Sequence, residues 1–296
     1  MLDIKKNVVL APYTSWKVGG PADFFFQPQS VRELTDALDW ADKDALPLTL
    51  LGGGTNVLVS DKGIRGLVLH LGLLSQMSAI EQNGRLVVTA QAGVPKSDLV
   101  KIFMKRKLAP AIFLAGLPGD VGGGVVMNAG VGEKIEPREF VEITDWVEIL
   151  KLDSRKIVRF AKSDLKWDYR KCLGWQPGIV LQAGFSWPLV EIPDLVEKVF
   201  AANRARISKQ PLNLPSCGSV FRNPDNDKSG RLIESIGLKG FTVGKAQVSP
   251  KHANFIVNLG GATASDIHAV ISHVRAEVSK NASVELETEV IYLGEW

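Results

Sequence analysis

Apolar side chains recur at helical spacing in several well-separated stretches of the chain. The first stretch, residues 31–43, follows a capping box formed by Ser30 and Glu33. The last begins at Thr263 and Asp266 and carries an apolar stripe as far as residue 278. A third stretch follows Pro95, a residue that favours the start of a helix. The pattern predicts helices over about 31–43, 95–107, 195–207 and from 263 onward.

Shorter runs rich in β-branched or alternating apolar residues predict strands. These runs cover residues 48–51, 56–60, 67–71, 85–91, 141–152, 156–160, 178–187 and 284–293. The prolines at positions 188 and 193 bracket a candidate domain boundary. We therefore expect a chain that mixes helices and strands and has a separate C-terminal part.

Two glycine-rich segments interrupt this pattern at the ends of predicted strands. GGGTN covers residues 52–56, and GLPGDVGGGVVMNAG covers residues 116–130 with six glycines, one charged residue and no aromatic residue. Glycine is used where the backbone must approach something closely, and consecutive free amides form an anion site. The segments therefore favour a phosphate-bearing ligand laid against bare backbone. Ordinary tight turns remain the alternative, since Val57 stands where a dinucleotide fingerprint needs its third glycine.

Composition narrows the class of protein. The 296 residues have room for two or three domains, and 45% hydrophobic with 23% charged residues is ordinary for an enzyme. The net charge of +3 gives no indication of nucleic-acid binding. Two cysteines make no disulfide framework, and no signal peptide is recognisable, so a cytoplasmic setting is expected. The four histidines lack ligand spacing, so no metal is expected. Residues 110–132 are long enough for a membrane span, but proline, aspartate and glycines argue against a helix there.

Three further segments carry candidate chemistry. The loop SCGSVFRNP, residues 216–224, offers a serine beside a glycine and donors at Arg222 and Asn223, but no base that would make the serine a nucleophile. The segment YRK, residues 169–171, is on composition an exposed strand edge. In the last predicted strand three glutamates alternate with apolar residues, which is typical of a solvent-facing edge.

Taken together, these segments resemble the UDP-N-acetylenolpyruvoylglucosamine reductase family along nearly the whole chain. The resemblance lies in several unrelated motifs that occur in the family's order. The motifs are TSWKVGGPAD, LGGGTNVLVSDKGIRGLVL, FLAGLPGDVGGGVVMNAG, DYR, SCGSVFRNP, GRLIESIGLKG, KHANFIVN and LETEV. No long tyrosine-bearing insertion lies between Tyr169 and Ser219, so the chain resembles the shorter subtype without a substrate-covering loop.

The resemblance implies an α+β fold. A flavin-binding α/β module of the PCMH or vanillyl-alcohol-oxidase type would be joined to a smaller C-terminal α+β substrate domain. The expected boundaries are 1–71 for one FAD-binding subdomain, 72–189 for the second and 190–287 for the substrate domain. The final strands, 288–296, would fold back onto the first subdomain.

The resemblance also implies an activity and its residues. The family reduces UDP-N-acetylglucosamine enolpyruvate to UDP-N-acetylmuramate for peptidoglycan synthesis, with bound FAD and with NADPH as the co-substrate. By their positions in the motifs, the catalytic residues would be Arg170, Ser219 and Glu289, and Tyr169 and Asn223 would contact substrate. The FAD would be held by Gly52, Gly53, Gly54, Thr55, Asn56, Gly116, Pro118, Gly122, Gly123 and Asn128.

We further expect a UDP-sugar as the small-molecule partner, no nucleic-acid or membrane partner, and a monomer. Two alternative functions are also consistent with the sequence. A flavin-dependent oxidase of the same superfamily would share the glycine segments but lack the pairing of Ser219 with Glu289. A nucleotide-sugar-binding protein without catalytic activity would contain no flavin.

Overall fold

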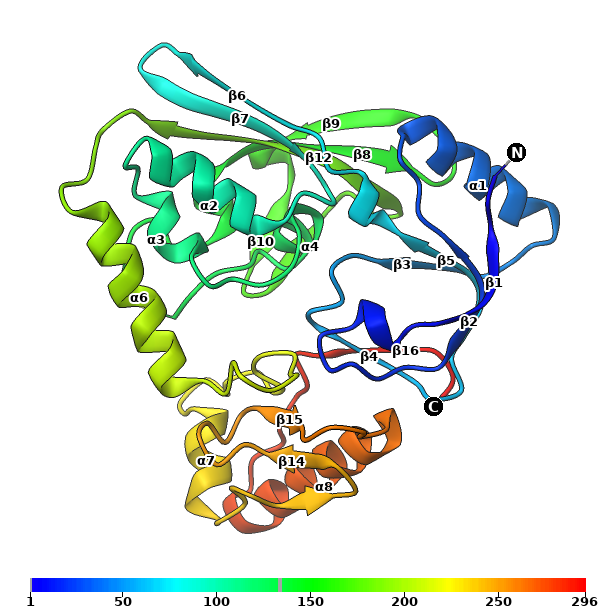
Figure 1. Ribbon diagram of the computed structural model, residues 1–296, viewed down its shortest axis with the longest axis vertical. Helices are drawn as coiled ribbons and strands as arrows, with labels where there is room; N and C mark the ends of the chain where they lie inside the picture. The colour runs from blue at the N-terminus through cyan, green and yellow to red at the C-terminus, as the bar shows by residue number, and fades with distance from the viewer. Residues whose placement is uncertain (1, 133–134) are drawn as a thin grey trace.

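The computed structural model describes residues 2–132 and 135–296, which form three main bodies around separate sheets (Figure 1). The helices are α1 (Val31–Lys43), α2 (Lys96–Lys105), α3 (Pro110–Leu114), α4 (Val121–Val126), α5 (Phe140–Ile143), α6 (Leu195–Lys209), α7 (Ser229–Ser235) and α8 (Ala264–Ala282). Short 3₁₀ turns, η1 (Ala11–Tyr13), η2 (Leu71–Leu73) and η3 (Lys162–Asp164), connect some of the strands.

The N-terminal body is built on a four-stranded sheet of order β1-β2-β5-β3. Its strands are β1 (Lys5–Val9), β2 (Pro21–Phe26), β3 (Leu48–Leu51) and β5 (Ile64–His70). β2, β5 and β3 run parallel, and α1 packs Leu34 and Leu38 against Phe26, Leu67 and Leu69 of this sheet. Beside it, β4 (Val57–Val59) pairs in parallel with β16 (Ile291–Leu293), so the C-terminal end of the chain returns to the N-terminal body (Figure 1).

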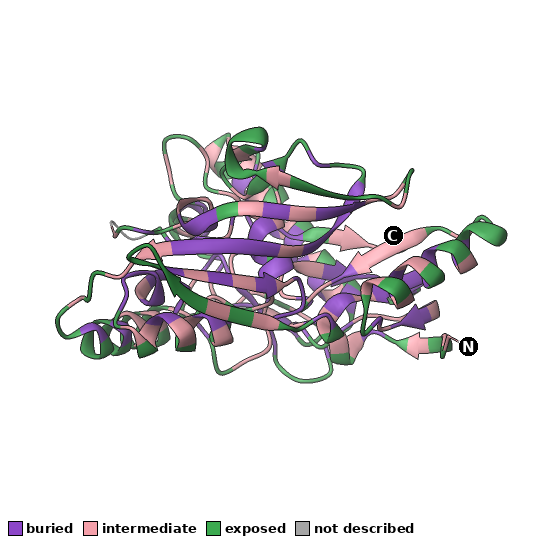
Figure 2. Ribbon diagram, turned by 90° about the horizontal axis from the view of Figure 1, so that it is seen from above, coloured by how far each residue is buried: buried purple, intermediate pink, exposed green. Residues whose placement is uncertain are grey.

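The second body is built on an antiparallel sheet of order β6-β7-β12-β8-β9. Its strands are β6 (Met77–Gln82), β7 (Arg85–Gln91), β8 (Thr144–Lys151), β9 (Ile157–Ala161) and β12 (Gly178–Pro188). The central strand β12 is buried along most of its length and the edge strands are largely exposed (Figure 2). The core beneath the sheet includes Phe103, Phe113, Phe140 and Phe185, because α2, α3, α4 and α5 contribute apolar residues to one cluster. A hairpin of β10 (Lys166–Asp168) and β11 (Lys171–Leu173) projects from this body.

The C-terminal body contains a three-stranded sheet covered by α8. The strands are β13 (Thr242–Val243), β14 (Ala246–Val248) and β15 (Ile256–Asn258). Trp16, from the N-terminal body, is fully buried in the core of this unit, and its indole Nε1 donates to the backbone oxygen of Ile256 at 2.7 Å. The Asn258 amide donates in return to the Trp16 backbone oxygen at 2.8 Å. The C-terminal body is therefore tied to the N-terminal one by buried polar contacts.

Both predicted helix starts carry an N-cap hydrogen bond, but the reciprocal bond of a capping box forms only at Thr263, because the Glu33 carboxylate accepts from the amide of Gln29 and not from that of Ser30. The backbone amide of Glu33 donates to the Ser30 hydroxyl at 3.2 Å, and that of Asp266 donates to the Thr263 hydroxyl at 3.0 Å. The predicted helices over 31–43, 95–107, 195–207 and from 263 are all present, with ends that differ by a few residues.

Two predictions about local structure were wrong. Residues 110–132, where proline, aspartate and glycines argued against a helix, contain the two short helices α3 and α4. Tertiary packing overrides the poor helix propensity, because Gly124 allows α4 to approach the ring of Phe140. Residues 284–290 are not a strand; Thr288 alone makes an isolated bridge, to Phe221, before β16 begins.

Across the described residues, no helix combines the length and apolar character that a membrane crossing needs.

We propose the domain boundaries expected from the sequence with one adjustment. Helix α6 lies within the expected substrate domain, 190–287, but its buried Leu195 and Val199 belong to the core of the second body. Figure 1 shows α6 running from the second body toward the C-terminal one. We therefore place the start of the C-terminal domain after α6.

Candidate active site

The first glycine segment forms the turn between β3 and β4. Gly54 has a φ of +63°, and a Cβ there would lie 2.0 Å from the backbone oxygen of Tyr13, so glycine is required by packing. A Cβ on Gly52 would meet only the carboxylate of Asp120, at 3.7 Å, and Gly53 is exposed. Gly52 and Gly53 therefore present bare backbone outward, as a ligand-binding turn requires.

The three consecutive glycines of the second segment have different surroundings. A Cβ on Gly122 would lie 2.9 Å from that of Ala92, and one on Gly124 would lie 2.4 Å from the ring of Phe140. These two glycines allow α4 to pack closely beneath the sheet. Between them, Gly123 is exposed, and a Cβ there would meet no atom within 4 Å. Gly123 is therefore the one of the three that leaves backbone open to a ligand.

The tertiary structure brings the two glycine segments together. A Cβ on Gly53 would lie 3.1 Å from the Cα of Gly119, and one on Gly119 would lie 2.7 Å from the hydroxyl oxygen of Thr55. The carboxylate of Asp120 lies 3.2 and 3.3 Å from the same Gly53 position. We call residues 52–55 together with 119–123 the glycine cradle. Exposed backbone without side chains fits a dinucleotide diphosphate, which binds well to free main-chain amides.

Two asparagines hold neighbouring segments in place. The Asn56 amide donates to the backbone oxygen of Glu289 at 2.9 Å, and the Asn56 backbone oxygen accepts from the amide of Ile291 at 3.0 Å. Asn56 therefore links the glycine cradle directly to the segment that carries Glu289.

Asn128 is 1% exposed, and its side chain makes three hydrogen bonds within the protein. Its amide donates to a carboxylate oxygen of Glu139 at 3.0 Å and to the backbone oxygen of Asp168 at 3.2 Å. Its side-chain oxygen accepts from the backbone amide of Val141 at 3.0 Å. Asp168 directly precedes the Tyr-Arg pair, so Asn128 positions the turn that carries Arg170.

The side chains of Tyr169 and Arg170 meet that of Glu289, although more than a hundred residues separate Glu289 from this pair in sequence. Tyr169 and Arg170 form the tip of the β10–β11 hairpin, where Arg170 has a φ of +56°. The guanidinium Nε of Arg170 lies 3.3 Å from one carboxylate oxygen of Glu289, and the Tyr169 hydroxyl lies 3.4 Å from the other. The Arg170 Nη2 also donates to the backbone oxygen of Gly130 at 3.1 Å. The ion pair is mostly buried, with 19% of the arginine and 14% of the glutamate side chain exposed.

Burial and neighbouring charges act in opposite directions on Glu289. Burial raises the pKa of its carboxyl above the usual range, whereas Arg170, Tyr169 and Arg222 oppose that rise. Burial and the charge of Glu289 also raise the pKa of Tyr169. The site therefore favours a glutamate that can hold a proton more readily than one in water.

Ser219 lies on a segment that runs beside Glu289. The backbone amide of Glu289 donates to the oxygen of Val220 at 2.8 Å, and the amide of Arg222 donates to the oxygen of Glu287 at 2.9 Å. These hydrogen bonds flank the bridge between Phe221 and Thr288. The backbone pairing therefore fixes the serine segment against the glutamate segment, and Ser219 itself is partly exposed.

The motif that contains Asn254 supports this pairing. The Asn254 side chain accepts from the Phe221 amide at 2.9 Å and donates to the Phe221 oxygen at 2.8 Å, and its backbone oxygen accepts from Val220. Asn223, the expected substrate contact, is exposed, and its side-chain oxygen accepts from the Ser229 amide at 3.1 Å.

Two of the expected cofactor residues lie toward the other end of the glycine segment. A Cβ on Gly116 would lie 3.1 Å from Asn203 and from Arg206, both on α6, and Pro118 is exposed. Gly116 is exposed and has a φ of +78°, so its backbone conformation accounts for glycine at this position.

Lys96 was not identified from the sequence. It is 5% exposed at the start of α2, its backbone amide donates to Gly119 at 3.0 Å, and its charge acts on Asp120 and Arg170. In the sequence, Asp120 stands out only as the one charged residue of its segment. The sequence signal for Lys96 was a lysine at a helix position that should face the core. Its inward orientation follows from packing between distant segments.

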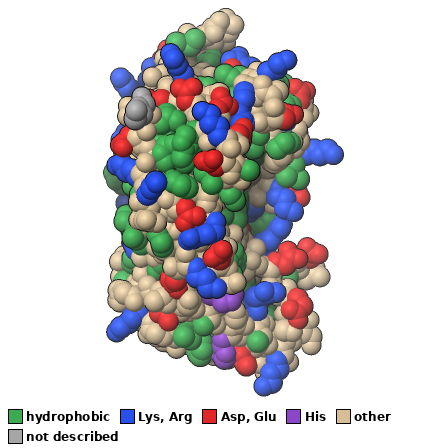
Figure 3. Space-filling model, turned by 90° about the vertical axis from the view of Figure 1, so that its right-hand side faces the viewer, with side chains coloured by type: hydrophobic (Ala, Val, Ile, Leu, Met, Phe, Trp, Pro, Cys, Tyr) green, Lys and Arg blue, Asp and Glu red, His purple; other side chains and the backbone are tan. Residues whose placement is uncertain are grey.

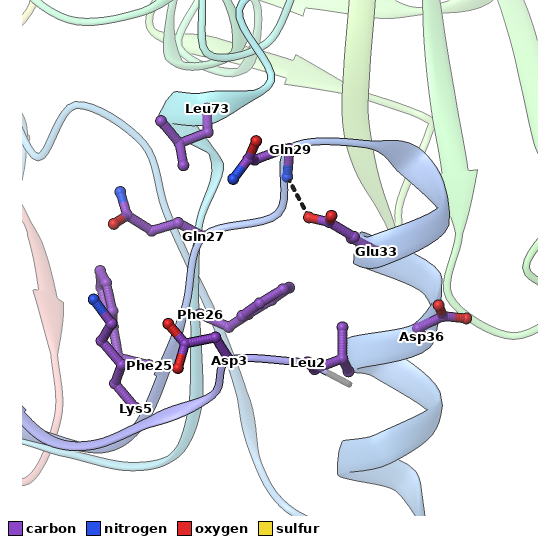
Figure 4. Close-up of a pocket in the computed structure, with 10 residues that line it drawn as sticks. All are labelled: Leu2, Asp3, Lys5, Phe25, Phe26, Gln27, Gln29, Glu33, Asp36 and Leu73. Atoms are coloured by element: carbon purple, nitrogen blue, oxygen red, sulfur yellow. Dashed lines mark hydrogen bonds between the residues drawn. The ribbon is translucent and has the colours of Figure 1, made fainter.

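Other surface features lie away from these residues. A hollow of about 490 Å³ lies against β1, β2 and α1, lined by residues such as Phe25, Gln27 and Glu33 (Figure 4). None of its lining residues is a candidate site residue. In the view of Figure 3, basic and acidic side chains are interspersed. Within the described ranges, no group of three or more histidine, cysteine, aspartate or glutamate side chains could hold a metal ion.

Comparison with known proteins places the chain in one family. The model for the C-terminal domain of UDP-N-acetylenolpyruvoylglucosamine reductase matches residues 210–293, and a model for an FAD binding domain matches residues 22–159. The reductase of Pediococcus pentosaceus is 42% identical over 99% of this chain and 95% of its own length. The reductase of Synechococcus is 40% identical over the same shares. The crystal structure of the reductase from Thermus caldophilus superposes with a TM-score of 0.81 at 29% identity, over 99% of this chain and all of that one. The fold class expected from the sequence is confirmed, and the chain belongs to the UDP-N-acetylenolpyruvoylglucosamine reductase family.

Proposed function

We propose that the chain reduces UDP-N-acetylglucosamine enolpyruvate to UDP-N-acetylmuramate, and that Arg170, Ser219 and Glu289 are its catalytic residues. The reaction is that of the family, with FAD as the bound cofactor and NADPH as the hydride donor. The contact between Arg170 and Glu289 is the main support for these catalytic residues. The segment that contains Ser219 is hydrogen-bonded through its backbone to the segment that contains Glu289.

The glycine cradle would hold FAD. Gly52, Gly53, Thr55 and Gly123 would lie against its diphosphate and the adjoining part of the flavin, where exposed amides can donate to charged oxygens. Four of the remaining expected residues, Gly54, Asn56, Gly122 and Asn128, would act through the backbone that they support. Gly116 and Pro118 are exposed on the same glycine-rich segment, where they would contact the cofactor directly.

The chain's own residues provide alignment and charge. The bound flavin would supply the hydride chemistry, with NADPH as the donor and the terminal vinyl carbon of the substrate as the acceptor. Arg170 pairs with the substrate carboxylate, toward which negative charge develops, and a protonated Glu289 donates to the same group. Burial, which raises the pKa of Glu289, favours the protonated donor, whereas the ion pair with Arg170 opposes it until the substrate carboxylate engages that arginine. Ser219 then gives its proton to the adjacent carbon.

Tyr169 and Asn223 would contact substrate. The Tyr169 ring packs against two guanidinium groups, with the Cζ of Arg170 at 4.7 Å and that of Arg222 at 5.5 Å from the ring centre. This cluster would present cations and a hydroxyl to an anionic UDP-sugar. Asn223 is exposed at the end of the serine loop, where its amide is free to donate.

Spectroscopy and half-reactions test the proposal. The purified protein should show flavin absorption bands, NADPH should bleach them without oxygen, and the enolpyruvyl UDP-sugar should restore them. A colourless protein that binds UDP-sugar would instead indicate a non-catalytic binding protein. Restoration by oxygen but not by the sugar would indicate an oxidase.

Oligomeric state and location belong to the same proposal. We expect a monomer that works in the cytoplasm and binds no nucleic acid. The net charge of +3 and two buried free cysteines support this expectation. Sedimentation at micromolar concentration would detect a dimer.

A further inference from the structure

Asp120 places a carboxylate against the amides of the glycine cradle. Its two oxygens lie 3.2 and 3.3 Å from the position of a Gly53 Cβ, and one lies 3.7 Å from that of Gly52. The Gly53 backbone amide favours the charged form of this carboxylate and so lowers its pKa. An internal anion therefore already lies against the turn that we propose for the FAD diphosphate.

A buried lysine faces the same region. Lys96 is 5% exposed, and it forms no hydrogen bond or ion pair through its ammonium group with any residue in the described part of the chain. The ammonium group lies 5.7 Å from the centre of the Phe140 ring. Its charge acts on Asp120 and also on Arg170. Among the described residues no fully buried side-chain nitrogen lacks a hydrogen bond, so the unbonded ammonium of Lys96 keeps some access to solvent, and a nearby anion would stabilise its charge.

A diphosphate in the cradle changes the electrostatic balance of this pair. Its negative charges would repel an ionised Asp120 and attract the ammonium of Lys96. The structure offers Asp120 no second cation, because Lys96 is the only charged group found to act on it among the described residues. Repulsion at short range in a partly buried site can be relieved when the carboxylate takes up a proton.

We propose that Asp120 and Lys96 form a charge-compensating pair at the glycine cradle, and that Asp120 takes up a proton from solvent when FAD binds. The proposal rests on our placement of the FAD diphosphate in that cradle. The pair would make the affinity for FAD depend on pH. The positive charge of Lys96 would offset part of the repulsion between the ionised Asp120 carboxylate and the diphosphate.

The ionisation of the two groups sets separate pH windows. Burial raises the pKa of Asp120 to about 6, although Lys96 and the Gly53 amide oppose the rise. A bound anion raises that pKa further, so FAD binding takes up protons above about pH 6 and the Kd rises by up to tenfold per pH unit. Burial lowers the pKa of Lys96 to about 8, although Asp120 opposes that change. Proton uptake by Lys96 is therefore confined to pH near 8 and above, and pH 7 isolates Asp120.

The experiment measures FAD binding to the full chain after its flavin has been removed. Calorimetry at pH 7 in two buffers of different ionisation enthalpy gives the number of protons taken up, and flavin fluorescence gives the Kd from pH 6 to pH 9. We expect net proton uptake by the wild type at pH 7. Asp120→Asn should abolish it, lower the Kd at least tenfold at pH 8, and flatten its dependence on pH between 6 and 8.

Two further variants sharpen the test. Lys96→Met should keep the uptake but shift its window to higher pH, because loss of the cation raises the pKa of Asp120. Asp98→Asn is the matched control: Asp98 also lies on α2 but pairs with Lys101 at the surface, so its loss should leave uptake and Kd unchanged. If Asp120→Asn does not fold, Asp120→Ser replaces it.

The outcomes separate this inference from the proposed function. Binding of FAD without proton uptake at pH 7, or uptake that persists in Asp120→Asn, overturns the pair while leaving the reductase intact. A protein that binds no FAD under any condition would instead overturn the proposed function. Loss of uptake in Asp98→Asn would show that the measured protons come from elsewhere, which also overturns the pair.

Discussion

Gly123 separates the requirements of folding from those of FAD binding. It lies within α4, is exposed, and a Cβ there would meet no protein atom within 4 Å. Alanine in a helix is more favourable than glycine by about 0.5–1 kcal/mol, because glycine loses more backbone entropy on folding. Gly123→Ala should therefore raise the unfolding temperature of the flavin-free protein, by about 1–3 °C.

The same methyl group should weaken binding of FAD. If the cofactor lies against Gly123, the added carbon holds it away from the backbone and lengthens a hydrogen bond to a charged oxygen. Such a bond contributes about 1.5–3 kcal/mol, which corresponds to about 10- to 150-fold in Kd. Stability and affinity should thus change in opposite directions in one variant.

Calorimetric unfolding of the flavin-free protein and quenching of flavin fluorescence measure the two effects. Gly124→Ala is the control, because a Cβ there would lie 2.4 Å from the Phe140 ring and should lower stability directly. A Gly123→Ala protein that purifies with full flavin and the wild-type Kd would refute our placement of the cofactor.

Three other substitutions test the remaining assignments. Ser219→Ala should slow flavin reoxidation by the enolpyruvyl substrate about 10²-fold while NADPH-driven reduction stays fast, and stopped-flow absorption that shows equal losses in both half-reactions would contradict its role. Glu289→Gln should reoxidise faster than Glu289→Ala if the residue donates a hydrogen bond; the reverse order would reject that. Asn254→Ala should lower the free energy of unfolding by about 1–3 kcal/mol per lost buried hydrogen bond, as measured by urea titration, and an unchanged midpoint would exclude its support of the serine loop.

Local signals in the sequence determined much of the secondary structure and the family. Ser30 and Thr263 begin helices because each hydroxyl accepts from an amide only three residues ahead, a contact that needs no tertiary partner. The motifs that carry the resemblance are also contiguous, so their order along the chain is enough to identify the reductase family.

Packing between distant segments decided the rest. Arg170 meets Glu289 because a hairpin tip reaches the segment before β16, and Gly53 meets Gly119 because two sheets pack against each other. No period in the sequence encodes such contacts. The same reason explains α4, where close packing on Phe140 outweighs poor helix propensity, and the inward orientation of Lys96. The sequence by itself therefore determined the family and the motifs that identify it, and the tertiary structure alone decided which residues face one another.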